Sequence, residues 1–268
     1  MLDAADKIRP LKAPAQHDVR SLAGKVSGEE WKQRVDLAAL YRIFALYGWD
    51  DLIFTHISAR VPGPEHHFLI NPYGLMFEEI TASSLVKIDV DGNKIVDSPF
   101  PVNAAGFTIH SALHMNREDA GCVIHLHTTD GVAVSAQKDG LLPLDQHAMM
   151  IAGEIAYHDY EGVALDLDER ERLVADIGEK NVMILRNHGT LAIGKNCADA
   201  FLRMFYLERA CSMQVRALAG GAAPNWPNQG VPEKTALQGQ GAFNGMVGAM
   251  AWPALRRKCD RVDPSYKN

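Results

Sequence analysis

Strand-like runs that are joined by tight turns constrain the fold of this chain more than any other feature. Asp91-Gly92-Asn93 separates one pair of such runs, and Arg186-Asn187-His188-Gly189 separates another. Strands joined by so short a connection pair antiparallel, because a parallel pair needs a long crossover. Helical patterns lie between these pairs, so the sequence predicts a mostly antiparallel sheet covered by helices. The paired runs are 85–90 with 94–96, and 181–185 with 190–193.

Other strands and helices follow from periodicity and from helix caps. Ser27 followed by Glu30 is a capping-box pattern, and Asn196 caps a long helical run that ends at Gly220-Gly221. Further strands are expected over 52–61, 67–70, 121–127 and 154–160, and further helices from Asn103, over 128–137 and over 169–178.

These signals divide the chain into three parts. The sequence predicts an N-terminal arm over 1–26, one globular domain over 27–221 and a C-terminal extension over 222–268. The extension begins with Pro and Trp residues, becomes rich in Gly and Gln, and ends in a short amphipathic piece over 252–262.

Composition excludes several classes of protein. The net charge of -6 and an isoelectric point near 6.0 provide no basic surface for nucleic acid or an anionic membrane. Residues 1–10 lack the apolar centre of a signal peptide, and no run approaches the roughly 20 apolar residues of a membrane span. The four cysteines form no CxxC pair. Reduced thiols in a cytoplasmic protein are the simplest interpretation, although four cysteines could also pair in a secreted one.

Two of the eleven histidines form the strongest candidate for a metal site. His125-Leu126-His127 lies in a predicted strand, where side chains two residues apart point to the same face. His188, in a tight turn before Gly189, is the candidate for a third ligand. Three neutral imidazoles leave a coordination position open, as in catalytic sites. Strand histidines are more often hydrogen-bonded than metal-bound, however, and imidazole accepts several metals, so spacing alone leaves both points open.

Four separated blocks carry a resemblance to a known family. In order and spacing they resemble the class II aldolase/adducin family, and most of all its adducin-like, bacterial-type branch. The resemblance runs from about Trp31 to Gly220. The blocks are PVNAAGFTIHSA at 101–112, VIHLHT at 123–128, YHDY at 157–160 and ILRNHG at 184–189.

The resemblance implies both a fold and a metal site. The expected fold is a three-layer α/β/α sandwich around a central, mostly antiparallel sheet, assembled as a homotetramer with active sites between subunits. In the sugar-phosphate aldolases of the family, three histidines hold zinc, and their positions fall on His125, His127 and His188. Zinc acts there as a Lewis acid on a substrate carbonyl. We therefore expect a divalent cation, zinc in the first instance, with manganese or iron as alternatives.

Differences from the aldolases predict a substrate without a phosphate group. Gly106 stands where the aldolases carry a general acid/base Glu, and Ala104 and Ala105 replace two serines that bind phosphate. His56 matches a phosphate-contacting Asn, and Tyr73-Gly74 matches a Thr-Gly loop. A phosphate dianion needs several donors, and two hydroxyl donors are missing here. The candidate substrate-binding residues are His56, Tyr73, Gly74 and Asn103.

Two histidines are candidates for catalysis. His147 falls where a tyrosine from the neighbouring subunit assists protonation in the aldolases, and a histidine titrates near neutral pH. A surface histidine at a helix start is an equally good interpretation. His56 could bind a substrate carboxylate, which we favour, add a metal ligand, or hydrogen-bond within its loop. His110 is one turn along the helix from Gly106 and could face the same cleft, but a buried structural role is expected for it, as for His158 and Tyr160.

Together these observations predict a metal-dependent lyase that cleaves a carbon–carbon bond in a small carbonyl compound or carboxylic acid. Retro-aldol cleavage and decarboxylation are both open. Decarboxylation needs no proton abstraction to begin, which fits the absence of a carboxylate at Gly106, and some relatives are similar to decarboxylases of aromatic acids.

Two other functions remain as alternatives. One is a non-haem iron oxygenase on the same fold. The other is a non-catalytic, adducin-like interaction protein, since adducin heads look similar even at the metal-histidine positions. Adducins carry a long lysine-rich tail, whereas this chain ends soon after Arg256-Arg257-Lys258, which favours an enzyme.

Overall fold

The computed structural model describes residues 19–164, 166–243 and 245–268. Its strands are β1 His56–Arg60, β2 Phe68–Ile70, β3 Val86–Ile88, β4 Cys122–Leu126, β5 Ile155–His158, β6 Val182–Leu185 and β7 Gly189–Gly194. They form one sheet in the order β3-β2-β1-β4-β7-β6-β5, in which every neighbouring pair is antiparallel except β5 with β6. The predicted mostly antiparallel sheet is confirmed.

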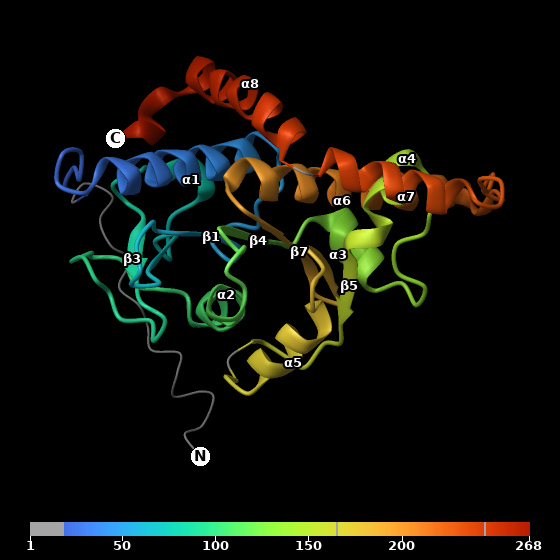
Figure 1. Ribbon diagram of the computed structural model, residues 1–268, viewed down its shortest axis with the longest axis horizontal. Coiled ribbons are helices and arrows are strands. Elements are labelled where there is room, and N and C mark those ends of the chain that lie inside the picture. Colours follow the sequence, from blue (N-terminus) through green and yellow to red (C-terminus); the bar gives the residue numbers. More distant parts are fainter. Residues whose placement is uncertain (1–18, 165, 244) are drawn as a thin grey trace.

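Helices cover both faces of this sheet (Figure 1). One layer contains α1 Gly28–Tyr47 and α6 Cys197–Leu218, and the other contains α2 Ala104–Asn116 and α5 Glu169–Ile177. The predicted three-layer α/β/α sandwich is therefore confirmed. The remaining helices are α3 Thr129–Ser135, α4 Gln146–Ile151, α7 Val231–Ala242 and α8 Met246–Val262, with short 3-10 turns at Phe77–Glu79, Ala152–Glu154, Ala219–Gly221 and Pro264–Lys267.

Strand β4 shows how the sheet separates two cores. Ile124 and Leu126 are buried in the core shared with α1 and α6, whereas Val123 belongs to the core shared with α2 and α5. Because side chains alternate along a strand, His125 points to the same face as Val123. The candidate site therefore lies on the α2 and α5 side of the sheet.

Both long helices begin at their predicted caps. The Ser27 hydroxyl accepts a hydrogen bond from the Glu30 N–H at 3.1 Å, and the Asn196 side chain accepts one from the Asp199 N–H at 3.0 Å. Glu30 does not complete a capping box, because its carboxylate binds Arg34 at 2.9 Å and Lys87 at 2.8 Å. The local sequence thus set where the helices begin, while tertiary packing redirected the Glu30 side chain.

Some predicted element bounds differ from those observed. The expected strand over 52–61 is limited to β1, and Leu52 has a φ of 50°, which an extended strand does not allow. The expected strand over 94–96 forms only an isolated bridge between Ile88 and Lys94. Helix α8 begins at Met246, ahead of the expected amphipathic piece over 252–262, and includes Pro253.

The C-terminal extension packs on the layer of α1 and α6 (Figure 1). Trp252 Nε1 and Arg256 both contact the carboxylate of Asp36 in α1, each at 3.1 Å, and Cys259 is buried. The proposed division into arm, domain and extension stays a prediction, and residues 1–18 of the arm lie outside the described residues. Within the described part of the chain, no helix combines the length and the apolar character of a membrane span.

Candidate functional site

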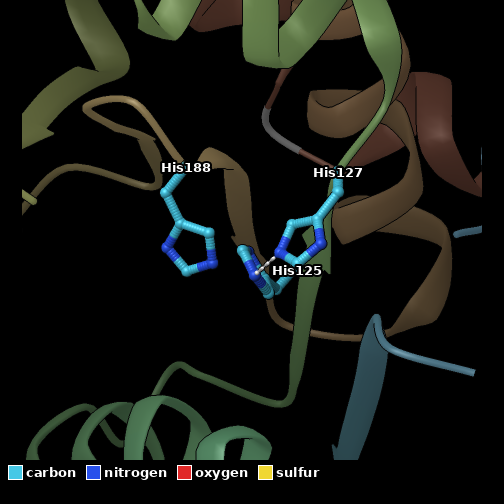
Figure 2. Close-up of side chains that lie close together, drawn as sticks. All are labelled: His125, His127 and His188. Carbon is cyan, nitrogen blue, oxygen red and sulfur yellow. Dashed lines mark hydrogen bonds between the residues drawn. The ribbon is translucent and has the colours of Figure 1, made fainter. Parts of the chain in front are cut away.

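Three histidines converge at one end of strand β4 (Figure 2). His125 lies in β4, His127 directly follows it, and His188 lies in the turn between β6 and β7. His125 Nε2 and His127 Nε2 are 2.8 Å apart, and one ring nitrogen from each of the three residues lies within 4.8 Å of the others. The two strand histidines therefore project together, as their spacing predicted, and the turn brings the third beside them.

The turn holds His188 in place through its neighbours. Asn187 has a φ of 56°, in the left-handed region. A Cβ at Gly189 would lie 2.4 Å from the Leu126 carbonyl oxygen, so the close approach of this turn to β4 requires a glycine. The tight turn thus places His188 against the end of the strand that carries His125.

Contacts on the far side of two rings orient them. His125 Nδ1 donates a hydrogen bond to the Thr190 carbonyl at 3.0 Å, and His127 Nδ1 contacts an Asp51 carboxylate oxygen at 3.1 Å. When both Nδ1 atoms carry the proton, both Nε2 atoms present lone pairs to each other at 2.8 Å. Such an arrangement needs a shared proton or a cation, so the donor set fits a metal ion.

Burial favours the neutral form of His125 and His188. His125 is 1% exposed, and burial lowers its pKa well below the usual 6.5, with the nearby His188 as the next cause. Burial also lowers the pKa of His188 to about 4. A metal ion binds the neutral form of imidazole, so burial leaves His125 and His188 in the form that can bind one.

A buried carboxyl group lies behind the triad. Glu208 of α6 accepts hydrogen bonds from the hydroxyls of Thr190, at 2.5 Å, and Thr128. Burial raises the pKa of Glu208 to about 7. Sequence reasoning missed Glu208 and both threonines, because a single acid in a long helix carries no spacing signal that links it to a site.

His56 stands beside the triad on the neighbouring strand. It is the cross-strand partner of His125 in the β1–β4 ladder, and the two ring centroids are 5.0 Å apart. Its ring occupies the place that a side chain at Gly106 would need, since a Cβ there would lie 2.8 Å from His56 Cδ2. His56 Nδ1 lies 2.8 Å from His110 Nε2. His110 is buried as expected, and its contact with His56 joins it to the site.

The other candidate substrate-binding residues lie near the start of α2. The Tyr73 N–H donates to the Pro101 carbonyl at 3.1 Å, which joins this loop to the segment before α2. Gly74 follows with a φ of 108°. The Asn103 carbonyl accepts a hydrogen bond from the Phe107 N–H at 2.9 Å, in the first turn of the helix that carries Gly106.

His147 lies apart from the triad within this chain. It is in α4, where its ring lies 4.9 Å from that of Tyr206 in α6, and its Nδ1 is 3.4 Å from an Asp145 carboxylate oxygen. Ile151 of the same helix is buried in the core on the α1 and α6 side of the sheet. The structure therefore does not bring His147 and His125 together within one chain.

Two residues that we expected to be structural differ in their surroundings. His158 is buried and binds Asp176 of α5 at 2.7 Å, which is a structural contact. Tyr160 is half exposed, with its ring centroid 6.0 Å from that of His188. Tyr160 thus borders the candidate site, a position that its sequence context did not indicate.

Comparisons with known proteins agree with this geometry. Residues 35–215 match the model of the Class II Aldolase and Adducin N-terminal domain. A crystal structure of an aldolase II superfamily protein from Pseudomonas syringae is 51% identical, with a TM-score of 0.89 over 93% of this chain and 100% of that one. An L-fuculose 1-phosphate aldolase from Glaciozyma antarctica is 26% identical, with a TM-score of 0.77 over 90% of this chain and 93% of that one.

Adducin is also among the relatives. Alpha-adducin of Rattus norvegicus is 47% identical over 196 residues, which are 72% of this chain and 26% of that protein. The predicted resemblance is thus confirmed by sequence and by structure, and the chain belongs to the class II aldolase/adducin family.

Proposed function

We propose that the protein is a metal-dependent carbon–carbon lyase in which His125, His127 and His188 hold a divalent cation. The observation that supports this most is the convergence of the three imidazoles, two of which already use Nδ1 for other contacts. When bound, the cation would act as a Lewis acid on a substrate oxygen. Zinc is the first choice, and manganese or iron are alternatives.

The proposed substrate is a small carbonyl compound or carboxylic acid without a phosphate group. His56 and Gly106 support this, because the ring fills the space of the side chain that is missing at residue 106. A buried neutral imidazole offers a phosphate no charge and at most one hydrogen bond. Tyr73, Gly74 and Asn103 are the further proposed substrate contacts.

His147 is proposed to act across a subunit interface of a homotetramer. Its side chain is 30% exposed and packs against Tyr206 of α6, whereas His56 contacts His110 of α2 on the opposite face of the sheet. His147 would therefore reach a site only on another copy. Mixing two inactive variants, His125→Ala and His147→Ala, tests this. Hybrid oligomers should regain part of the activity, because some sites then combine an intact triad with an intact His147. No recovery after verified subunit exchange would count against the proposal.

Metal content is the first test of the triad. Elemental analysis of the purified protein should find about one zinc, manganese or iron per chain, and His125→Ala and His188→Ala should each lose it while keeping the fold. His67→Ala, a histidine outside the site, is the matched control and should keep the metal. Full occupancy in both triad variants would show that the ligand assignment is wrong.

Product analysis then separates the two reactions. Short hydroxy-oxo acids and aromatic carboxylic acids are incubated with the metal-loaded protein, and aldehyde and carbon dioxide are both measured. Aldehyde with a matching carbonyl fragment indicates retro-aldol cleavage, and carbon dioxide alone indicates decarboxylation. Consumption of dioxygen by the iron-loaded protein would instead favour the oxygenase alternative.

An adducin-like interaction protein is the second candidate function. The identity of 47% with alpha-adducin over 196 residues favours it. If the protein binds no stoichiometric metal, even after reconstitution, the result would favour this interaction function over the lyase. A cytoplasmic location is proposed in either case, supported by the four cysteines, which are all unpaired and buried.

A further inference from the structure

A buried chain of hydrogen bonds leads from the candidate site into the interior. His56 Nδ1 lies 2.8 Å from His110 Nε2, and His110 Nδ1 lies 2.5 Å from Ser58 Oγ. Ser58 Oγ also lies 2.6 Å from His114 Nε2, and His114 Nδ1 lies 2.9 Å from the Ala120 carbonyl oxygen. None of the four side chains is more than 2% exposed. The chain is therefore shielded from bulk water, and its His56 end lies beside His125 of the candidate site.

The last contact determines the direction of every bond. The Ala120 carbonyl can only accept, so His114 Nδ1 carries a proton and Nε2 of the neutral ring accepts the Ser58 hydroxyl proton. The Ser58 oxygen then accepts from His110 Nδ1, and His110 Nε2 accepts from His56 Nδ1. His56 is consequently the Nδ1–H tautomer, and its Nε2 carries the lone pair.

The position of His56 makes this lone pair relevant to the substrate. His56 is the cross-strand partner of His125, so the two rings lie on one face of the sheet. Its Nε2 would lie 3.1 Å from a Cβ at Gly106, and its Cδ2 2.8 Å. The imidazole thus stands where a side chain on α2 would otherwise reach toward the triad.

We propose that His114, Ser58 and His110 hold His56 as a hydrogen-bond acceptor, so that the preferred substrate presents a hydroxyl group to His56 beside the carbonyl bound at the triad. This inference rests on the proposed function and narrows its substrate class to hydroxycarbonyl compounds. A hydroxyl contact at His56 also replaces the carboxylate contact that we expected from the sequence. The lone pairs of a carboxylate would face the lone pair on His56 Nε2, and the two would repel each other. His56 is a substrate-binding residue here, and His110, Ser58 and His114 are positioning residues.

The tautomer can be read directly by NMR. Long-range proton–nitrogen correlation spectra of protein labelled with nitrogen-15 in histidine should show His56 with a protonated Nδ1 and an unprotonated Nε2, assigned by loss of the signals in His56→Asn. Metal-free and zinc-loaded protein should agree. A protonated Nε2 would overturn the proposal, and so would an Nε2 signal that shifts to a zinc-bound value on loading. Because the metal-free protein also reports the tautomer, this result is separate from the failure of the proposed lyase function.

Binding of matched compounds tests the substrate class. We expect the zinc-loaded protein to bind hydroxypyruvate more tightly than pyruvate, and glycolaldehyde more tightly than acetaldehyde, by the threefold to tenfold that is typical of about one neutral hydrogen bond. Calorimetric titration measures the ratio within each pair. Equal affinities within both pairs, or no binding of the hydroxyl compounds, would overturn the proposal.

Variants of His110 separate positioning from packing. His110→Leu fills the space but cannot accept from His56, so the preference for the hydroxyl compound should fall to about one while zinc content stays unchanged. His110→Gln offers an accepting oxygen and should restore part of the preference. His67→Ala is the control and should keep all of it. If His110→Leu and His110→Gln both bind like the unmodified protein, His110 has only a packing role and the proposal fails.

Discussion

Glu208 and His125 are joined through a single residue, Thr190. The Thr190 hydroxyl donates to Glu208 Oε1 at 2.5 Å, while its backbone carbonyl accepts the hydrogen bond from His125 Nδ1 at 3.0 Å. Glu208 also binds the hydroxyl of Thr128, the residue that follows His127. One buried carboxyl group in α6 therefore holds in place two residues, Thr128 and Thr190, that contact or adjoin the two strand histidines.

Glu208→Ala should weaken metal binding without removing a metal ligand. Loss of an outer contact that orients a ligand typically costs about tenfold to a hundredfold in metal affinity. Competition with a chromophoric zinc chelator measures the dissociation constant. Glu233→Ala, an exposed acid on α7, is the control. An unchanged zinc affinity in a folded Glu208→Ala protein would show that the Glu208 contacts do not affect the metal site.

Gly106→Ala should displace the His56 ring and destabilise the fold. A Cβ at residue 106 lies 2.8 Å from His56 Cδ2, which is closer than real contacts allow, and overpacking of this kind costs about 1–3 kcal/mol. Urea unfolding measures the loss. In the background of His56→Ala the same change should cost much less, because the ring that it meets is gone. Equal costs in both backgrounds would show that the two positions do not compete for space.

Stability should decrease as the pH falls below 6.5, because His110 and His114 resist protonation in the folded state. Burial lowers the pKa of His114 to about 3 and that of His110 well below the usual 6.5. Between the folded and unfolded pKa values the unfolded chain binds more protons. The free energy of unfolding then falls by roughly 1 kcal/mol per pH unit for each histidine.

Urea unfolding at a series of pH values within this window checks the slope. His114→Gln removes one titrating group and should make the slope shallower by about one proton. His67→Ala serves as the control, since His67 lies outside the buried chain. A slope that is identical in His114→Gln and in the unmodified protein would contradict the prediction.

Glu30→Ala should be among the most destabilising single changes in α1. Arg34 is fully buried, and its Nε binds Glu30 at 2.9 Å while Nη1 donates to the Leu85 carbonyl at 2.8 Å. Removing the carboxylate leaves a buried cation without its partner charge, which costs about 3–5 kcal/mol. Glu29→Ala, an exposed change in the same helical turn, should cost well under half of that. Similar unfolding free energies for the two variants would refute the assigned role.

Structural features that depend on a few neighbouring residues were predictable from the sequence. The caps at Ser27 and Asn196, and the common face of His125 and His127, follow from backbone geometry within a single turn or strand. The turn around His188 was also predicted, and the resemblance to a known family implied the three-layer sandwich with a mostly antiparallel sheet. The predictions of the fold and of the histidine triad were based on these local features and on the family resemblance.

Contacts between distant segments were not predictable in the same way. Ser58 and His114 are 56 residues apart, and Thr128 and Glu208 are 80 residues apart, so no local pattern links them. The Glu30 side chain of the predicted capping box was mispredicted for the same reason, since its carboxylate binds Lys87, which is distant in the sequence.

By itself, the sequence determined most of the strands and helices, the face on which two histidines project, and the family to which the chain belongs. Only the tertiary structure decided that His56 fills the space at Gly106 and that its Nδ1 is turned toward His110. The physical reason is that the direction of a hydrogen-bonded chain depends on its terminal acceptor. Here that acceptor is the Ala120 carbonyl, six residues after His114, and the chain that leads from it to His56 forms only when Ser58 of β1 packs against His110 and His114 of α2.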